Sequence, residues 1–457
     1  MRLRLKYLGT AIVIVNLIFL YCFYTDFHGG LTELTYGKQI LNSPKTALFK
    51  LSINLRFPPT ETLGNVTFAN INIDQDDTFL TWLKDETSLC EDGFLGYAHL
   101  FAKLNNVFLD PSFSAGPEGG EDIQSVINRP EEEEFLFVKP GYFQIHCQNK
   151  EISQYTFESD DHLMKWMSAL RPVLEFTSYE DIPEVTIAVT RYEYANIYHT
   201  MTDWYNAYLM LLFFNIKSLR ANILFVDSHP RGELDSTWTT LFGEFIRARQ
   251  VKKPKRFESL IWNIQGYRSP MYDHELPSIP YIEYFRLFFL GKHNVLSTKT
   301  LHCKNLSILF IWRRNYVAHP RNPKGVVSRK VKNEKELESL VHELYPNHSI
   351  ASIQTDKLTM RDQLSAIVNT DILIGMHGAG LTLALFLPKH AGLVEIYPKY
   401  WSSDNAHFRA ITRWRNLQYR QWQNTKNENE FPNHYTYIPP SVIQNLLSET
   451  INEMCRP

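Results

Sequence analysis

The sequence predicts a protein of the α/β class whose sheets are mainly parallel. Short apolar runs, typical of buried strands, alternate with helix-like segments from about residue 185 to residue 397. Alternation at this short spacing indicates βαβ units. A stretch rich in Pro, Tyr and Gly, residues 266–296, separates the units into two series. We therefore expect two facing Rossmann-like domains, residues 51–300 and residues 301–457, with 266–296 as the linker.

The first series opens with the apolar run Val185–Thr190, which we interpret as a buried strand. Further strands are expected at 221–227 and 259–265, and helices at 196–214 and 238–249. The second series predicts strands at 307–312, 349–353, 371–376 and 393–397, and helices at 333–344, 359–369 and 381–387. Asn333 and Thr359 are suited to cap their helices, and Pro388 ends the last one.

The N-terminal segment predicts a membrane anchor. Arg2, Arg4 and Lys6 precede an apolar stretch, residues 7–24, of about the length of a spanning helix. The stretch ends in two tyrosines, a cysteine and a phenylalanine, a poor site for signal cleavage. The positive-inside rule makes residues 1–6 a cytosolic tail, 7–24 a transmembrane signal anchor and 25–50 a stem. The alternative is a long signal peptide that is removed, and in both cases the rest is lumenal.

Sequons and cysteines agree with a lumenal location. Three sequons occur, at Asn65, Asn305 and Asn347. Outside the anchor the cysteines are Cys90, Cys147, Cys303 and Cys455, an even set that allows three disulfide pairings. The simplest pairing is Cys90–Cys147 with Cys303–Cys455. None of the cysteines has CxxC spacing, so we expect no zinc site.

The overall charge excludes one class of partner. The 457 residues have a formal net charge of -2, and 44% of them are hydrophobic. Such a chain has no basic field to hold nucleic acid. Its hydrophobic and charged fractions are those of ordinary globular proteins.

A glycine-rich turn at residues 375–380 is the first candidate site. It lies between a predicted strand and the start of a helix, where backbone N–H groups attract anions. Without side chains at Gly378 and Gly380, these groups could approach a pyrophosphate closely, together with Ala379. His377 could donate a hydrogen bond to the same group. The alternative is a tight turn that only permits close packing of helix and strand.

Three further candidate side chains lie at or near the ends of predicted strands. Arg313 and Arg314 come at the end of the strand from Ser307, and arginine can bind phosphate oxygens bidentately. Glu395 lies near the end of another strand, where a carboxylate suits a ribose diol. The alternatives are a solvated strand end and a charge at a sheet edge.

On the predicted helix 196–214, His199 and Asp203 share one face at i, i+4 spacing. Either could deprotonate an acceptor hydroxyl. The alternative is a packed amphipathic helix with a satisfied histidine.

Asp74 and Asp76 form a DxD pattern, by which another transferase architecture binds Mn²⁺. No βαβ pattern leads into it, so we do not expect a metal site there.

The run 371–381, followed by Val394–Ile396, resembles glycosyltransferase family 61. Residues 190–204, and residues 314–323 with Ser328 and Arg329, are similar to the plant-type β-1,2-xylosyltransferase branch of that family. The resemblance covers roughly residues 85–425.

The resemblance implies an inverting enzyme of the GT-B type that needs no cofactor and no strict metal, although a divalent cation is not ruled out. The donor would be a UDP-sugar and the acceptor a glycan or glycoprotein hydroxyl. The branch implies transfer of xylose from UDP-xylose to the core β-mannose of N-glycans in the Golgi membrane.

Alternatives remain. Residues 455–457 are not an ER-retention signal, and this disfavours the O-GlcNAc-transferase branch and the endoplasmic reticulum. A membrane-anchored glycan-binding protein without activity keeps the same fold. An NAD-binding protein is disfavoured by the glycine spacing.

Overall fold

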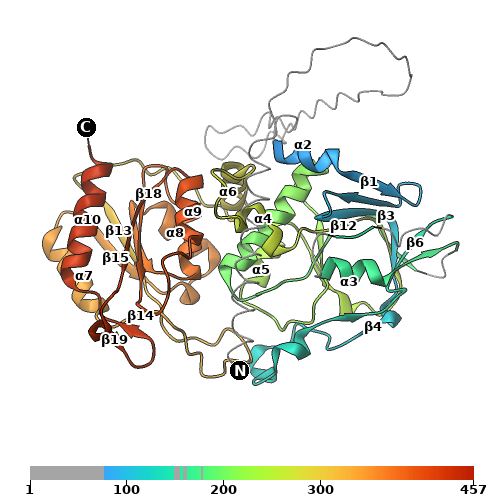
Figure 1. Cartoon of the computed structure of the whole chain (residues 1–457), viewed down its shortest axis with the longest axis horizontal. Helices are drawn as coiled ribbons and strands as arrows, with labels where there is room; N and C mark the ends of the chain where they lie inside the picture. Colours follow the sequence, from blue (N-terminus) through green and yellow to red (C-terminus); the bar gives the residue numbers. More distant parts are fainter. Residues whose placement is uncertain (1–76, 149–154, 158–161, 176–178, 457) are drawn as a thin grey trace, which may run out of the picture. The chain divides into compact units, whose positions relative to one another are not determined.

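The computed structural model describes residues 77–148, 155–157, 162–175 and 179–456. All of them lie in one compact unit, Ser52–Pro457. The fold is mixed α/β, as the sequence predicts (Figure 1). The expected tail, anchor and stem, Asn65, and the Asp74–Asp76 pattern lie outside the described residues. Among the described helices, none is both long and apolar enough to cross a membrane.

The first sheet has ten strands in the order β1-β2-β3-β12-β9-β10-β11, with β6, β7 and β8 paired at its side. Its strands are β1 (Glu86–Leu89), β2 (Phe94–Tyr97), β3 (Phe101–Leu109), β6 (Phe143–His146), β7 (Leu170–Val173), β8 (Glu180–Ile182), β9 (Thr186–Val189), β10 (Asn222–Phe225), β11 (Phe245–Arg247) and β12 (Lys255–Trp262). Strands β12, β9, β10 and β11 are parallel, and β9, β10 and β12 confirm the three strands expected in this half.

An antiparallel extension corrects the expected parallel sheet. Strands β1, β2 and β3 pair antiparallel with one another, and β3 pairs antiparallel with β12. The turn from β1 to β2 contains Cys90–Asp92, all with positive φ. Short connections of this kind join antiparallel strands, whereas parallel neighbours need a long crossover.

The helices of this half are α2 (Asp77–Lys84), α3 (His162–Ala169), α4 (Ile197–Phe213), α5 (Asp235–Leu241) and α6 (Ile282–Lys292). Helix α4 confirms the expected helix, and the Asn196 side chain caps it by accepting from Tyr198 N. Most of its residues are buried on every side, which is typical of a helix enclosed by other elements.

Two expectations for this half were wrong. The helix expected at 238–249 ends at Leu241, because Gly243 has φ +147 and the chain continues into β11. The expected linker 266–296 contains α6. Its Ile282, Phe285 and Phe289 are buried at helical spacing, a signal that the flanking prolines and tyrosines obscured.

The second sheet is fully parallel, with the order β15-β13-β16-β17-β18. Its strands are β13 (Ser307–Ile311), β15 (Ser349–Ile353), β16 (Ile372–Met376), β17 (Gly392–Tyr397) and β18 (Gln418–Gln423). Helices α7 (Glu334–Leu344) and α10 (Pro440–Met454) cover one face, and α8 (Met360–Val368) and α9 (His407–Trp414) cover the other (Figure 1). Four of the strands, and helices α7 and α8, confirm the expected elements. The helix expected at 381–387 is the 3-10 helix η9 (Ala379–Phe386).

One hydrophobic core includes residues from both halves. Trp204 of α4 and Phe289 of α6 belong to the same buried cluster as Phe386 of η9 and Ile411 of α9. Because the described residues form one compact unit, the division at residue 300 stays a prediction.

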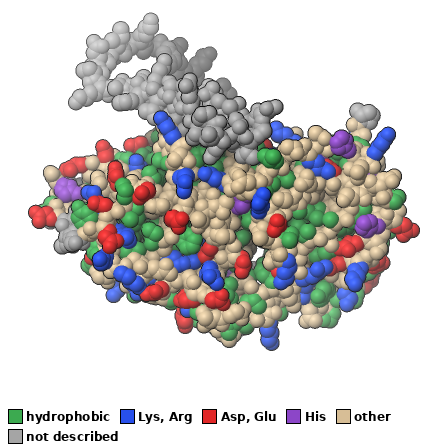
Figure 2. Space-filling view, turned by 180° about the vertical axis from the view of Figure 1, so that it is seen from behind, with side chains coloured by type: hydrophobic (Ala, Val, Ile, Leu, Met, Phe, Trp, Pro, Cys, Tyr) green, Lys and Arg blue, Asp and Glu red, His purple; other side chains and the backbone are tan. Residues whose placement is uncertain are grey.

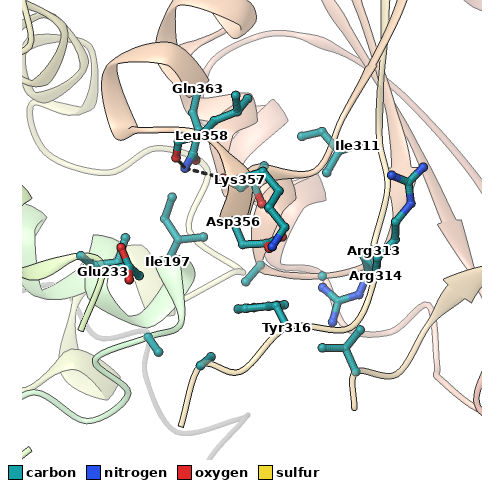
Figure 3. Close-up of a pocket in the computed structure, with 18 of the residues that line it drawn as sticks. Ile197, Glu233, Ile311, Arg313, Arg314, Tyr316, Asp356, Lys357, Leu358 and Gln363 are labelled. Atoms are coloured by element: carbon teal, nitrogen blue, oxygen red, sulfur yellow. Dashed lines mark hydrogen bonds and ion pairs between the residues drawn. The ribbon is translucent and has the colours of Figure 1, made fainter. Parts of the chain in front are cut away.

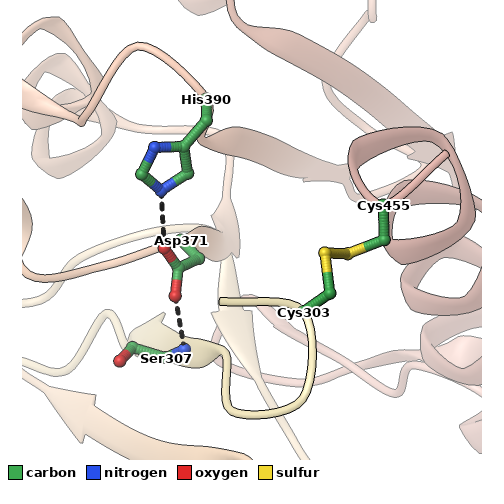
Figure 4. Close-up of a disulfide and its surroundings, with 5 residues drawn as sticks. All are labelled: Cys303, Ser307, Asp371, His390 and Cys455. Carbon is green, nitrogen blue, oxygen red and sulfur yellow. Dashed lines mark hydrogen bonds and ion pairs between the residues drawn. A yellow bond between two sulfur atoms is a disulfide. The ribbon is translucent and has the colours of Figure 1, made fainter. Parts of the chain in front are cut away.

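Two disulfides are formed, Cys90–Cys147 and Cys303–Cys455. This is the pairing that the sequence analysis took as simplest. Figure 4 shows that the second bond joins the segment before β13 to the end of α10. Nearby, the Asp371 carboxylate accepts hydrogen bonds from Ser307 N and His390 Nε2, both at 2.7 Å. The sequon residues Asn305 and Asn347 are exposed.

Figure 2 shows one face of the molecule, on which Lys and Arg side chains are interspersed with Asp and Glu. No single sign of charge dominates this face, in agreement with the near-neutral net charge.

Candidate active site

A pocket of about 480 Å³ lies beyond the carboxyl ends of β13 and β16 (Figure 3). Its walls come from the second sheet and from the start of α4. The lining includes Ile197, Glu233, Arg313, Arg314, Tyr316, Asp356, Lys357, Gln363, Gly378, Ala379 and Gly380. Ligands of parallel sheets bind at this edge, so this is the candidate site.

The glycine turn between β16 and η9 forms one wall of the pocket. A Cβ on Gly378 would overlap Arg313 Nη1, so the missing side chain lets the guanidinium lie against the turn. A Cβ on Gly375 would lie 2.9 Å from Leu381 Cδ2 and 3.2 Å from the Ile311 carbonyl oxygen. Gly375 thus serves close packing, whereas Gly378 makes room for a cation. The packing interpretation thus holds at Gly375, while the binding of an anion at the turn stays a prediction.

The two candidate arginines differ in what they contact. Figure 3 shows their side chains diverging from the end of β13. Arg314 forms an ion pair with Glu334 at 2.6 Å, and its side chain is 53% exposed. Arg313 donates from Nε to the Ser328 carbonyl at 3.1 Å, and burial lowers its pKa. Arg313 is therefore the better placed of the two to bind an anion in the pocket.

His377 and Glu395 lie together in the interior. His377 Nδ1 is 2.6 Å from Glu395 Oε1, and the Tyr419 hydroxyl donates to Glu395 Oε2 at 2.7 Å. Both carboxylate oxygens are thus engaged, and Glu395 is fully buried. In this arrangement Glu395 orients the His377 ring, which differs from the expected contact with a ribose.

The pKa of His377 is lowered first by burial. The Glu395 carboxylate opposes this effect, and the charges of Arg329 and Arg313 add to it. His377 is thus neutral in the unliganded protein, with Nδ1–H donated to Glu395. An anion beside the two arginines would raise its pKa again.

A group of histidines and aromatic rings adjoins His377. The His407 ring lies 5.8 Å from His377 and 4.4 Å from His274, measured between ring centroids. The Tyr198 hydroxyl, at the start of α4, lies 2.6 Å from His274 Nε2. This cluster connects the end of β16 with the N-terminus of α4.

The two candidate bases on α4 have different surroundings. His199 is partly exposed among Tyr192, Tyr267 and Tyr272, and burial lowers its pKa, so it is neutral and able to accept a proton. Asp203 is 3% exposed, and burial raises the pKa of its carboxyl well above the usual range.

The conspicuous charged residues near α4 form a structural network. Arg191 binds the Asp227 carboxylate with two nitrogens and also contacts Asp235, which in turn binds Arg247. All four side chains are buried. They hold the end of β9 against α5 and leave no group free for substrate.

Sequence reasoning gave no site role to Arg329, and it did not single out Trp401, His407 or His274. These residues come from loops and from the start of α9. Within the described ranges, no group of three or more His, Cys, Asp or Glu is placed to hold a metal ion.

Comparison with known proteins places the site in a family. Residues 197–394 match the family model described as Glycosyltransferase 61. This segment includes α4, the pocket arginines and the glycine turn. The chain is therefore a glycosyltransferase.

Relatives of known name agree with the family. The chain is 28% identical to a β-1,2-xylosyltransferase of Oryza sativa subsp. japonica, over 73% of this chain and 67% of the relative. It is 26% identical to the β-1,2-xylosyltransferase of Arabidopsis thaliana, over 69% and 72%. An EGF domain-specific O-linked N-acetylglucosamine transferase of Drosophila melanogaster is 26% identical, over 62% and 56%. In this family setting, the pocket at the glycine turn is the candidate donor site.

Proposed function

We propose that this glycosyltransferase transfers xylose from UDP-xylose to the core β-mannose of N-glycans, with inversion at the anomeric carbon. The similarity to two plant β-1,2-xylosyltransferases, over about 70% of the chain, carries the proposal. We further propose a GT-B type fold and a type II membrane protein of the Golgi, with the active part in the lumen.

The pocket supplies the donor side of the proposal. Its volume of about 480 Å³ suits a nucleoside. The diphosphate would lie on the amides of Gly378, Ala379 and Gly380, beside Arg313. Cations and amides fixed in advance stabilise the negative charge that develops on the leaving group.

Helix α4 supplies the acceptor side. As the bond from C1 of xylose to the β-phosphate oxygen breaks, its electron pair stays on that oxygen. The acceptor oxygen forms the new bond to C1, and its proton passes to His199 or Asp203. Exclusion of water from the site would limit hydrolysis of the donor.

A second candidate is transfer of N-acetylglucosamine to protein or to O-mannose glycans. Six EGF domain-specific O-linked N-acetylglucosamine transferases also match, several of them 36% identical over 96 residues. These matches cover less of the chain than those to the plant enzymes, so xylose is the favoured sugar.

A donor panel tests the proposal. The full-length protein is incubated with UDP-xylose, UDP-GlcNAc or UDP-glucose and a truncated N-glycan, in EDTA, and the product is weighed by mass spectrometry. We expect addition of a pentose from UDP-xylose alone. Addition of an N-acetylhexosamine would keep the family and replace the donor. Absence of both transfer and thermal stabilisation by UDP would favour a glycan-binding protein.

A further inference from the structure

Arg329 lies beside Arg313 but has no role in the donor site described so far. The carbonyl of its neighbour Ser328 accepts the hydrogen bond from Arg313 Nε at 3.1 Å. The Arg329 guanidinium carbon lies 4.1 Å from the centre of the Trp401 ring. Its Nε is buried and has no hydrogen-bond partner. The side chain is thus held in place by stacking, with donors left over.

Arg313 and Arg329 differ from the buried arginines, which have carboxylate partners. The most buried arginines each contact a carboxylate: Arg191 with Asp227 and Asp235, Arg247 with Asp235, and Arg286 and Arg415 with Glu283. Within the part of the chain that the structure describes, Arg313 and Arg329 form no such ion pair. Burial lowers the pKa of Arg329 to about 10, and the charge of Arg313 adds to the effect.

Two neighbouring half-buried cations without a carboxylate are costly in the free protein. The carboxylate that most nearly offsets the Arg329 charge is Glu395, whose oxygens are held by His377 and Tyr419. The positive charge is therefore uncompensated until an anion enters.

The backbone of Arg329 is held in an uncommon conformation. Its φ is +60°, in the left-handed region that residues other than glycine seldom adopt. The Arg329 N–H donates to the Tyr400 hydroxyl at 2.9 Å, and that hydroxyl donates to the His434 carbonyl at 3.3 Å. Strained residues held by their surroundings in this way cluster at ligand sites.

The positions of the groups in the site indicate how the donor is oriented in it. Arg313 lines the pocket together with the glycine turn, whereas Arg329 is not among the lining residues. Arg329 shares Trp401 with His377, whose ring centroid is 6.0 Å from that of Trp401. From the pocket outward, the groups are therefore arranged in space in the order Arg313, Arg329 and the histidine cluster.

We infer that Arg329 binds the β-phosphate of the donor, on the side of the leaving group, while Arg313 binds the α-phosphate. The inference rests on the proposed function, because the nucleoside must occupy the pocket. The sugar then lies toward His377 and His407. When the bond between C1 and the β-phosphate oxygen breaks, Arg329 lies next to the oxygen that keeps the electron pair.

Titration with UDP, UMP and uridine tests this polarity. Isothermal titration of the full-length protein compares the wild type with R329M, R313M and, as a matched control, R220Q at an exposed arginine outside the pocket lining. R329M should weaken UDP binding about 10- to 100-fold, the range for charge-assisted hydrogen bonds. It should leave the affinities for UMP and uridine unchanged. R313M should weaken UDP and UMP alike, and R220Q none of the three.

Stability measurements separate this role from a merely structural one. If Arg329 is a half-buried cation without an ion pair, its removal should keep or raise the unfolding temperature of the free protein, so R329M should be at least as stable as the wild type. R329K, which keeps the charge but loses the planar fork, should recover part of the UDP affinity. Unchanged UDP affinity in R329M and R329K, or equal losses for UMP and UDP, would overturn the inference. A wild-type protein that binds no UDP would instead refute the proposed function.

Discussion

His407 is a neutral histidine within a cationic environment. Burial lowers its pKa to about 3, and His274, His377, His199 and Arg329 act in the same direction. Its Nδ1 is buried without a partner. In an unfolded chain, a histidine has a pKa of about 6.5. Between about pH 6.5 and about pH 3, His407 is therefore protonated in the unfolded state but not in the folded state.

The free energy of unfolding should accordingly fall as the pH drops below about 6.5, and continue to fall toward about pH 3. In H407Q, the slope of the unfolding free energy against pH should be smaller than in the wild type by at most about 1.4 kcal/mol per pH unit. Urea denaturation at a series of pH values measures it, with H342Q on the exposed side of α7 as the control. Equal slopes for H407Q and the wild type would contradict the prediction.

His199 and Asp203 are separable as candidate bases. Burial raises the pKa of the Asp203 carboxyl well above its usual range and so favours the protonated form, which asparagine resembles in shape. D203N should therefore retain most of the turnover. H199N should lower kcat by about 10²- to 10⁴-fold, the usual contribution of a general base, without changing UDP affinity. Steady-state kinetics with the preferred donor decides between them. A large loss in D203N with little loss in H199N would reverse the assignment.

At the scale of elements, the turn between β16 and η9 has two glycines with different duties. G378A should displace the flexible Arg313 side chain, so UDP affinity should fall while the unfolding temperature changes little. G375A places a Cβ against Leu381 and the Ile311 carbonyl, so it should lower stability by about 1 to 3 kcal/mol. Thermal unfolding and UDP titration of both variants check this contrast. Equal effects of the two substitutions on affinity would show that the turn acts only through its packing.

Much of the second half of the fold was predictable because four of its strands are short and regularly spaced, whereas β18, α9 and α10 were not predicted. Helix α8 shows its predicted cap, with the Thr359 hydroxyl accepting from Asp362 N at 3.2 Å. The predicted cap of α7 was wrong, because the Asn333 side chain bonds Ile438 and makes no capping hydrogen bond. The antiparallel strands β1–β3 were not predicted, and the pairing of β3 with β12 joins residues about 150 positions apart, which no local pattern encodes. Helix α6 was missed where flanking prolines and tyrosines favoured a loop.

The site was predictable only where a local pattern exists. The sequence brought attention to Arg313 and to the turn 378–380, which line one pocket. It also suggested a ribose contact for Glu395, whereas the buried carboxylate holds His377 and Tyr419. Arg329 and His407 meet His377 only through long-range packing, which no spacing rule encodes.

At the scale of the whole molecule, the Cys303–Cys455 disulfide closes a loop of 152 residues that includes the second sheet. A crosslink of this span restricts the unfolded chain, and C303S/C455S should cost about 2 to 5 kcal/mol. Denaturant unfolding of the double variant measures the loss. UDP affinity under native conditions should persist, because Cys303 precedes the start of β13, whereas the pocket lies beyond the carboxyl end of that strand. Unfolding free energies that match the wild type would show that the bond adds nothing.

The hydrophobic cluster shared by both halves also affects folding during synthesis. Helix α4 and helix α9 contribute to the same core, yet 201 residues separate Phe213 from Trp414. At about 5 to 20 residues per second, the ribosome releases α4 roughly 10 to 40 s before α9. During that interval, α4 lacks the part of its core that the second half supplies. Newly made chains therefore expose apolar surface of α4 until synthesis is nearly complete.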